Sequence, residues 1–283
     1  MPEDKHVTTR SQVKIPKMIY GTAWKKERTT EYVQQALSAG FRGIDTACQP
    51  KHYQEELVGK AIQISAIPRS EIFIQTKFTP LPGQDPNRLP YDAKAPLETQ
   101  VEQSIGASLK NLGTEYLDSL VLHSPLHSLE TTLVAWRKME SFVREGQIKQ
   151  LGISNCYDKR LFESLYDHVD IKPAVLQNRF YSESGYDRAL RKFCQDQQIV
   201  YQSFWTLTAN PHILNSRTVQ KISSELDYTP AQIFFRSLIQ QGIVPLTGTT
   251  NPLHMEQALA CLSFTLSSEQ VNDVFSLTGG SVK

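Results

Sequence analysis

The sequence has no long apolar run and no excess of one charge. Its 283 residues include 30 Lys and Arg against 29 Asp and Glu, which gives a net charge of +1. Because the cationic residues are spread along the chain, we expect neither a nucleic acid nor a membrane surface as a partner. No segment approaches the roughly 18 apolar residues of a transmembrane helix, and the polar N-terminus lacks the apolar core of a signal peptide. These absences predict a cytoplasmic protein.

Cysteine is also scarce, and its spacing is uninformative for pairing. The four cysteines lie far apart and form no CxxC pair: Cys48, Cys156, Cys194 and Cys261. We therefore expect no disulfide framework and no thiolate metal site. A reducing compartment is the simplest interpretation.

What the chain does contain is a repeated alternation of strand-like and helix-like segments. Eight short runs rich in branched and aromatic residues span 18–24, 41–47, 71–77, 116–124, 148–155, 174–180, 199–205 and 242–249. Helical patterns between or after them include 29–40, 96–113, 128–146, 158–168, 186–197, 217–241 and 252–263. Parallel strands need such helical crossovers, and eight units most simply close into a single-domain (β/α)₈ TIM barrel. An open doubly wound sheet is the alternative, but no GxGxxG turn follows the first strand.

Two segments fall outside this repeat. Residues 1–14 are polar and are predicted to be a partly ordered tail, with the barrel domain covering residues 15–283. Residues 79–95 hold four prolines and no helical period, which predicts a long loop of the kind often used as a lid.

Reactive residues gather at the predicted carboxyl ends of the strands, where barrels of this kind carry their chemistry. Asp45, Lys77 and His123 each end or closely follow a strand. A charged group at an apolar barrel mouth costs desolvation energy unless it is paired, so Asp45 and Lys77 are expected to form an ion pair. A nearby lysine cation would also lower the pKa of Tyr53 and make it a usable general acid.

Several of these segments resemble one known family. GTAW, GIDTA followed by a tyrosine and ELVG, the TK of the third strand, LDSLVLHSP, GISN, the Gln after the sixth strand and TNP resemble the aldo-keto reductases, in a short form similar to fungal members. The resemblance runs from about residue 16 to residue 275. It implies a (β/α)₈ barrel that reduces a small-molecule aldehyde or ketone, with NADPH (NADP+) as the cofactor in preference to NADH. A monomer or a weak dimer is expected.

The resemblance also implies roles for individual residues. The catalytic group becomes Asp45, Tyr53, Lys77 and His123: Tyr53 would protonate the carbonyl oxygen, the Asp45 and Lys77 pair would tune Tyr53, and His123 would orient the substrate. Cofactor contacts are implied for Thr22, Ser154, Asn155, Gln177, Phe204, Leu207, Gly248, Thr249, Thr250, His254 and Gln257. Substrate contacts are expected from Trp24, His123 and Trp205, with the 79–95 loop and His127 adding specificity.

The sequence departs from the family pattern in two places. Tyr53 follows Asp45 by eight positions where five are usual, so residues 48–50 are interpreted as an inserted bulge. Gly248, Thr249 and His254 stand where many members carry a Lys-Ser pair and an Arg for the 2′-phosphate. Backbone donors near Gly248 and the N-terminus of a helix capped by Asn251 remain suitable for an anion.

Two other functions fit parts of the pattern. A strand-end lysine is also found in Schiff-base lyases built on barrels, which would make Lys77 a nucleophile. A regulatory subunit could keep the barrel and the nicotinamide site but turn over little. The complete set of reactive residues favours a reductase over both.

Overall fold

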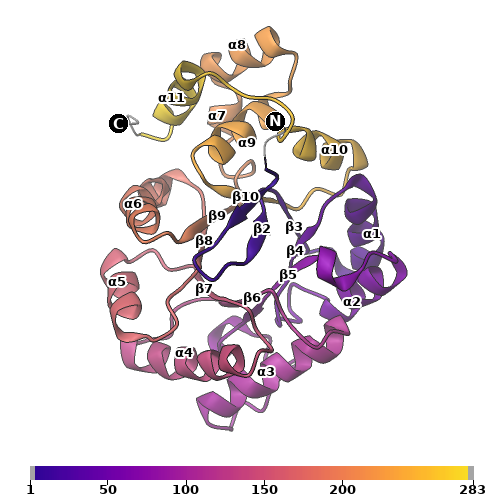
Figure 1. Cartoon of the computed structure of the whole chain (residues 1–283), viewed down its shortest axis with the longest axis vertical. Helices are drawn as coiled ribbons and strands as arrows, with labels where there is room; N and C mark the ends of the chain where they lie inside the picture. The colour runs from indigo at the N-terminus through magenta and orange to yellow at the C-terminus, as the bar shows by residue number, and fades with distance from the viewer. Residues whose placement is uncertain (1–3, 280–283) are drawn as a thin grey trace.

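The computed structural model describes residues 4–279, and they form a closed barrel of eight parallel strands ringed by helices (Figure 1). In order around the barrel the strands are β3 (Ile19–Gly21), β4 (Gly43–Asp45), β5 (Phe73–Phe78), β6 (Ser119–Leu122), β7 (Leu151–Ser154), β8 (Val175–Arg179), β9 (Val200–Phe204) and β10 (Val244–Thr247), which pairs with β3. Each one overlaps a predicted strand. The predicted single-domain barrel is therefore confirmed.

The helices lie outside the strands and mostly follow the predicted ranges. They are α1 (Thr29–Ala39), α2 (Glu55–Ile64), α3 (Leu97–Leu112), α4 (Leu129–Arg144), α5 (Lys159–His168), α6 (Arg188–Asp196), α7 (Pro211–Leu214), α8 (Arg217–Leu226), α9 (Pro230–Gln240), α10 (Pro252–Ala260) and α11 (Ser268–Ser276). Local chemistry sets several ends: Gly40 and Gly113 take left-handed conformations after α1 and α3, and Thr229 starts α9 with a capping box. Within residues 4–279, no helix combines the length and apolarity needed to cross a bilayer.

The N-terminal segment forms a hairpin that the sequence did not predict. Strands β1 (His6–Thr8) and β2 (Lys14–Pro16) pair antiparallel and lie across one opening of the barrel (Figure 1). Val13 and Ile15 are buried against Ile19 and Phe73 at the amino ends of the strands. This apolar contact explains why much of the predicted tail is structured, whereas residues 1–3 lie outside the described residues.

The barrel interior is layered from the hairpin to the opposite mouth. Because side chains alternate along a strand, every second residue of β5, β8 and β9 points inward. From the amino to the carboxyl end, each of these strands places an apolar residue, a glutamine and then a charged or aromatic residue in the interior: Phe73, Gln75, Lys77; Val175, Gln177, Arg179; Val200, Gln202, Phe204. The mouth formed by the carboxyl ends of the strands therefore carries the polar side chains.

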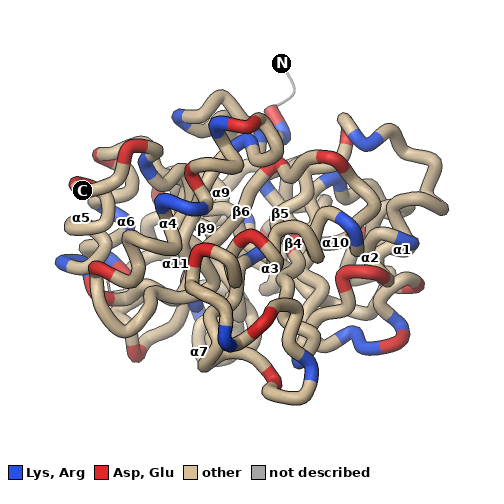
Figure 2. The backbone as a smooth tube through the Cα atoms, turned by 90° about the horizontal axis from the view of Figure 1, so that it is seen from below, with Lys and Arg blue, Asp and Glu red and all other residues tan. Residues whose placement is uncertain are grey.

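Charge is distributed evenly over the backbone. Basic and acidic positions are interspersed around the molecule in Figure 2, without a segment of a single sign. This agrees with the net charge of +1.

Candidate active site

A buried ion pair lies at the centre of the barrel mouth. Lys77 Nζ is 2.6 Å from Asp45 Oδ2 and donates a second hydrogen bond, of 2.8 Å, to the carbonyl oxygen of Thr46. Both side chains are almost fully buried. The ion pair predicted from the sequence is confirmed, and it gives two buried charges the partners that they need in a low-dielectric site.

Two buried glutamines bind the other oxygen of Asp45, and a third glutamine links them. Gln75 and Gln177 each donate a hydrogen bond to Asp45 Oδ1, at 2.8 and 3.0 Å. Both also donate to Oε1 of Gln202, and Gln202 returns a bond to Gln75. Two amide donors and one lysine thus satisfy the carboxylate. Gln177, predicted to bind the cofactor, therefore also positions Asp45.

Replacing Gln202 by leucine should test this network. The change removes the shared acceptor of two amides inside the barrel, and buried donors that lose a partner cost about 1–3 kcal/mol. We expect urea unfolding to show a stability loss in that range. The matched control is Gln195→Leu on the exposed face of α6, which should change the stability little; equal losses in the two variants would contradict the assigned network.

The inserted bend between Asp45 and Tyr53 is an ordered continuation of the strand edge. Cys48 forms a parallel bridge with Phe78, and the backbone N–H of Tyr53 donates to the carbonyl oxygen of Gln49 at 3.0 Å. Gln49 also donates from its side chain to the carbonyl oxygen of Gly83 at 2.6 Å. The bend is therefore fastened both to β5 and to the long loop that follows it.

Tyr53 is held equally firmly from the helix side. Glu55, the first residue of α2, is buried and accepts hydrogen bonds from Thr76 on β5 and from Ser108 on α3. Gly59 allows α2 and α3 to approach closely, because a Cβ there would lie 2.3 Å from the carbonyl oxygen of Asn111. These contacts fix the start of α2, and with it the tyrosine two residues earlier.

The longer bend still brings Tyr53 to the ion pair. Lys77 Nζ lies 5.4 Å from the centroid of the Tyr53 ring, and the ring centroids of Tyr53 and His123 are 6.1 Å apart. The four residues proposed as catalytic from the sequence, Asp45, Tyr53, Lys77 and His123, thus meet at one end of the barrel. Tyr53 and His123 line a cavity of about 650 Å³.

The electrostatics of Tyr53 differ from the prediction. Burial, assisted by the Asp45 carboxylate, raises the pKa of Tyr53 above its ordinary value of 10.0. Burial also lowers the pKa of Lys77, against the opposing effect of Asp45. The prediction that the pKa of the phenol is lowered beside Lys77 is therefore wrong, because desolvation and the nearby carboxylate raise it. Tyr53 is consequently a neutral phenol near pH 7.

The imidazole of His123 is held in place by Thr79, the residue that follows β5. Its Nδ1 atom lies 2.6 Å from the hydroxyl oxygen of Thr79, just beyond β5. Burial, with the charges of Lys77 and His52 acting in the same direction, lowers the pKa of His123 well below 6.5. The ring is therefore neutral near pH 7, and Thr79 fixes its orientation.

Comparison with known proteins identifies the family. The aldo/keto reductase family model matches residues 17–210. Similar proteins include an oxidoreductase of Schizosaccharomyces pombe, 28% identical over 97% of this chain and 92% of its own, and an NADPH-dependent alpha-keto amide reductase of Saccharomyces cerevisiae, 27% identical over 91% of this chain and 84% of its own. The crystal structure of an aldo-keto reductase from a deep-sea metagenome library, 28% identical, has a TM-score of 0.83 over 98% of this chain and 97% of its own. The chain belongs to the aldo/keto reductase family.

Membership of the family gives the general class of chemistry. Aldo-keto reductases are oxidoreductases that use a nicotinamide cofactor and act on small carbonyl compounds, and the relatives above carry reductase or oxidoreductase names. The protein is therefore an enzyme of this class.

The residues predicted to hold the cofactor in this aldo-keto reductase divide between two adjoining cavities. The larger cavity is lined by Ser154, Asn155, Gln177, Phe204, Leu207, Gly248 and Thr249. A second one, of about 390 Å³, includes Leu207, Thr249, His254 and Gln257. Thr22 lines neither of these two cavities, since it is buried and donates to the carbonyl oxygen of Asp45, and Thr250 is exposed on the loop before α10.

Among the residues of the larger cavity that were not predicted from the sequence, three have basic side chains. Lys25 follows the GTAW segment and donates a hydrogen bond to the carbonyl oxygen of Gly248, across the pocket mouth. Arg179 lies two residues after Gln177, and the His52 ring packs at a tilt against Trp24 with ring centroids 3.8 Å apart. Arg179 could have been predicted, because every second residue of β8 points into the barrel. The positions of Lys25 and His52 depend on how their loops fold.

The long loop does not act as the sequence suggested. Trp24 and Trp205 are exposed and line the larger cavity as predicted, but neither residues 79–95 nor His127 are among the residues that line it. The loop is instead tied down near Thr79, whose carbonyl oxygen accepts hydrogen bonds from Tyr91 and Gln84. In this conformation it supports the bend and His123 and does not cover the cavity.

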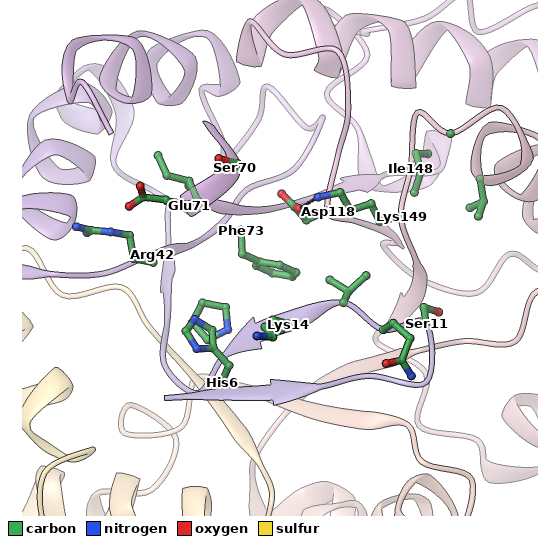
Figure 3. A pocket seen from close by; sticks show the side chains of 16 residues that line it. His6, Ser11, Lys14, Arg42, Ser70, Glu71, Phe73, Asp118, Ile148 and Lys149 are labelled. Atoms are coloured by element: carbon green, nitrogen blue, oxygen red, sulfur yellow. Dashed lines mark hydrogen bonds and ion pairs between the residues drawn. The ribbon is translucent and has the colours of Figure 1, made fainter. Parts of the chain in front are cut away.

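A further cavity lies at the opposite end of this aldo-keto reductase barrel. It has a volume of about 730 Å³ and is bounded by the hairpin and the amino ends of β5 and β6 (Figure 3). Its buried carboxylate, Asp118, is already paired with Arg69 and Lys149 at 2.9 and 2.8 Å. The amino-terminal face of a barrel usually serves stability, and these satisfied charges agree with that role.

Proposed function

We propose that the protein reduces aldehydes or ketones to alcohols with NADPH, and that Tyr53 donates the proton to the carbonyl oxygen. The observation that carries this proposal is the buried pair of Lys77 and Asp45 beneath Tyr53, at a cavity that Tyr53 shares with His123. Carbonyl reduction is assisted by a proton donor, by a cation that stabilises the donor once it has lost its proton, and by a second hydrogen-bond donor to the carbonyl oxygen. Tyr53, Lys77 and His123 can provide these three groups.

The raised pKa of Tyr53 suits a proton donor. A phenol that stays protonated at neutral pH is ready to donate when negative charge develops on the carbonyl oxygen. As the proton leaves, the Lys77 cation stabilises the phenolate that forms. Asp45 and the glutamines behind it keep that cation in place.

His123 would orient the substrate as a neutral donor. When the hydroxyl of Thr79 donates to Nδ1, the imidazole proton resides on Nε2. The Nε2–H group can then donate to the same carbonyl oxygen that Tyr53 protonates. Two donors converging on one oxygen fix the carbonyl and polarise it.

The residues around the two adjoining cavities fit a dinucleotide. Phe204 offers a ring face for a nicotinamide, Ser154 and Asn155 offer polar groups for its carboxamide, and Asn251 caps the start of α10 beside the second cavity. Gly248 has no side chain to cover its backbone, and the Lys25 ammonium group lies beside it. When bound, the nicotinamide supplies the hydride.

NADPH is the preferred form in this proposal. A similar protein is named for NADPH dependence, and the exposed His254 on α10 lines the second cavity. Comparing NADPH and NADH affinities in wild type and His254→Ala by fluorescence tests the preference. A selective loss of NADPH affinity supports it, whereas equal affinities for the two cofactors in wild type would overturn it.

The direct test of the function is an assay with a panel of carbonyl compounds. The purified protein is mixed with NADPH and aldehydes, alpha-keto amides or dicarbonyls, and the absorbance of the reduced cofactor is followed. We expect loss of absorbance that depends on both protein and carbonyl compound. Binding of NADPH without turnover on any compound would favour a regulatory subunit, and absence of cofactor binding would exclude the proposed function.

The pH dependence should reflect the shifted groups. Since the pKa of His123 is well below 6.5 and that of Tyr53 is above 10.0, neither group changes charge between about pH 6 and about pH 9. We expect kcat/KM for reduction to be flat over this range and to fall only when Tyr53 ionises at higher pH. An inflection near pH 6.5 that disappears in His123→Gln would show that the histidine is not held neutral.

A Schiff-base lyase is disfavoured by the surroundings of Lys77. A nucleophilic amine must be neutral and reach the substrate, but Lys77 is 1% exposed and its Nζ is occupied by Asp45 and Thr46. Borohydride should therefore trap no carbonyl compound on this lysine.

A further inference from the structure

Arg179 is a cation at the barrel mouth without an anionic partner. It lines the same cavity as Tyr53 and His123. Within the part of the chain that the structure describes, no carboxylate lies within ion-pair distance of its guanidinium, and its Nε atom is buried without a hydrogen-bond acceptor. A buried guanidinium N–H group without an acceptor is unfavourable in the free protein, so a ligand that supplies one would gain from it.

Aromatic rings hold this side chain in one orientation. The guanidinium carbon is 3.9 Å from the centroid of the Trp205 ring and 5.3 Å from that of Tyr181. The backbone N–H of Arg179 is also fixed, by a 3.1 Å hydrogen bond to the hydroxyl of Tyr157. Stacking occupies the faces of the guanidinium and leaves its edge, with several N–H donors, for an acceptor.

The position of Arg179 points to the substrate and not to the cofactor phosphates. It lies two residues nearer the mouth than Gln177, in register with Phe204. In the barrel order β8 is opposite β4, the strand that leads to Tyr53. The groups suited to phosphate, around Gly248 and the start of α10, follow a different strand. A molecule whose carbonyl meets Tyr53 would therefore extend toward Arg179.

We propose that Arg179 binds a carboxylate on the substrate, so that the preferred substrates are small aldehydes or ketones that carry a carboxylate group. This inference rests on the proposed carbonyl reduction. The planar guanidinium binds a carboxylate with two parallel hydrogen bonds. Asp45 is already paired with Lys77, so it does not compete for the arginine.

The test compares substrates that differ only in this charge. Rates are measured with NADPH for para-carboxybenzaldehyde and its methyl ester, and for pyruvate and its methyl ester. We expect wild type to favour the acid in kcat/KM by at least about tenfold, the effect of one such interaction. Arg179→Met should abolish the preference by raising KM for the acid alone, and Arg179→Lys should retain part of it. Arg217→Met, an exposed position on α8, should behave as wild type.

Other outcomes separate the two proposals. Turnover of esters and acids with equal efficiency in wild type would overturn the carboxylate assignment and leave carbonyl reduction intact. A loss of NADPH affinity in Arg179→Met, with both substrates slowed alike, would show that the arginine binds a cofactor phosphate. If wild type turns over no compound, the proposed carbonyl reduction is wrong, and the carboxylate site is tested separately by titrating benzoate and following Trp205 fluorescence. A fluorescence change in wild type that is lost in Arg179→Met supports the carboxylate site, whereas no change in wild type overturns it.

Discussion

Replacing Lys77 by methionine is expected to lower kcat for carbonyl reduction by about 10³-fold and to destabilise the fold. The catalytic loss follows because the phenolate formed from Tyr53 would lack the nearby cation, an electrostatic contribution of this size in other active sites. The stability loss follows because Asp45 would remain buried with amide donors only, and breaking a buried ion pair costs about 3–5 kcal/mol. Steady-state kinetics and urea unfolding measure the two effects.

A double variant separates these two roles of Lys77. In Lys77→Met combined with Asp45→Asn, no charge is left unpaired, so stability should recover by more than half while kcat stays low. Recovery of activity together with stability would contradict a catalytic role for the cation. The control Lys192→Met removes an exposed lysine of α6, paired with Asp196 on the surface, and should change neither quantity much.

Replacing Tyr53 by phenylalanine should remove the proton donor while keeping the ring. General acid catalysis contributes about 10²–10⁴-fold, so kcat should fall within this range. The ring contacts with Lys77 and His123 do not need the hydroxyl, so stability and cofactor affinity should be nearly unchanged. Single-turnover loss of cofactor absorbance measures the rate of reduction, and cofactor fluorescence measures the cofactor affinity.

Two comparison variants make the Tyr53 result specific. Tyr116→Phe removes the hydroxyl of a ring that packs against Arg69 and Lys149, at the other end of the barrel, and should keep wild-type activity. His52→Gln changes the residue that precedes Tyr53; the His52 ring packs against Trp24. A larger loss in His52→Gln than in Tyr53→Phe would show that the longer bend presents the histidine, and not the tyrosine, to the substrate.

The barrel was predictable because its signals are local and repeated. Eight branched or aromatic runs separated by helical patterns leave few ways to build a sheet, and each predicted strand overlaps an observed one. The hairpin at residues 6–16 was not predicted, because its strands have only three residues each and its buried residues, Val13 and Ile15, depend on contact with Phe73. The folding of such a segment is decided by tertiary contact and not by its own pattern.

The site was predictable only where residues end strands. Asp45, Lys77 and His123 were found by position, and their meeting with Tyr53 follows from barrel closure. The glutamines were largely missed because polar residues inside short strands look like ordinary edge residues until closure brings three of them together. The pKa of Tyr53 was mispredicted because charge was considered without desolvation, which is the larger effect in a buried site.

The most direct test of the central claim is a crystal structure with NADP+ and a small carbonyl compound bound. We predict that the Tyr53 hydroxyl and His123 Nε2 both lie within hydrogen-bond distance of the carbonyl oxygen, with Lys77 next to the phenol oxygen. A carbonyl oxygen bound instead by His52, with the Tyr53 hydroxyl turned away from it, would contradict the role of Tyr53 as proton donor.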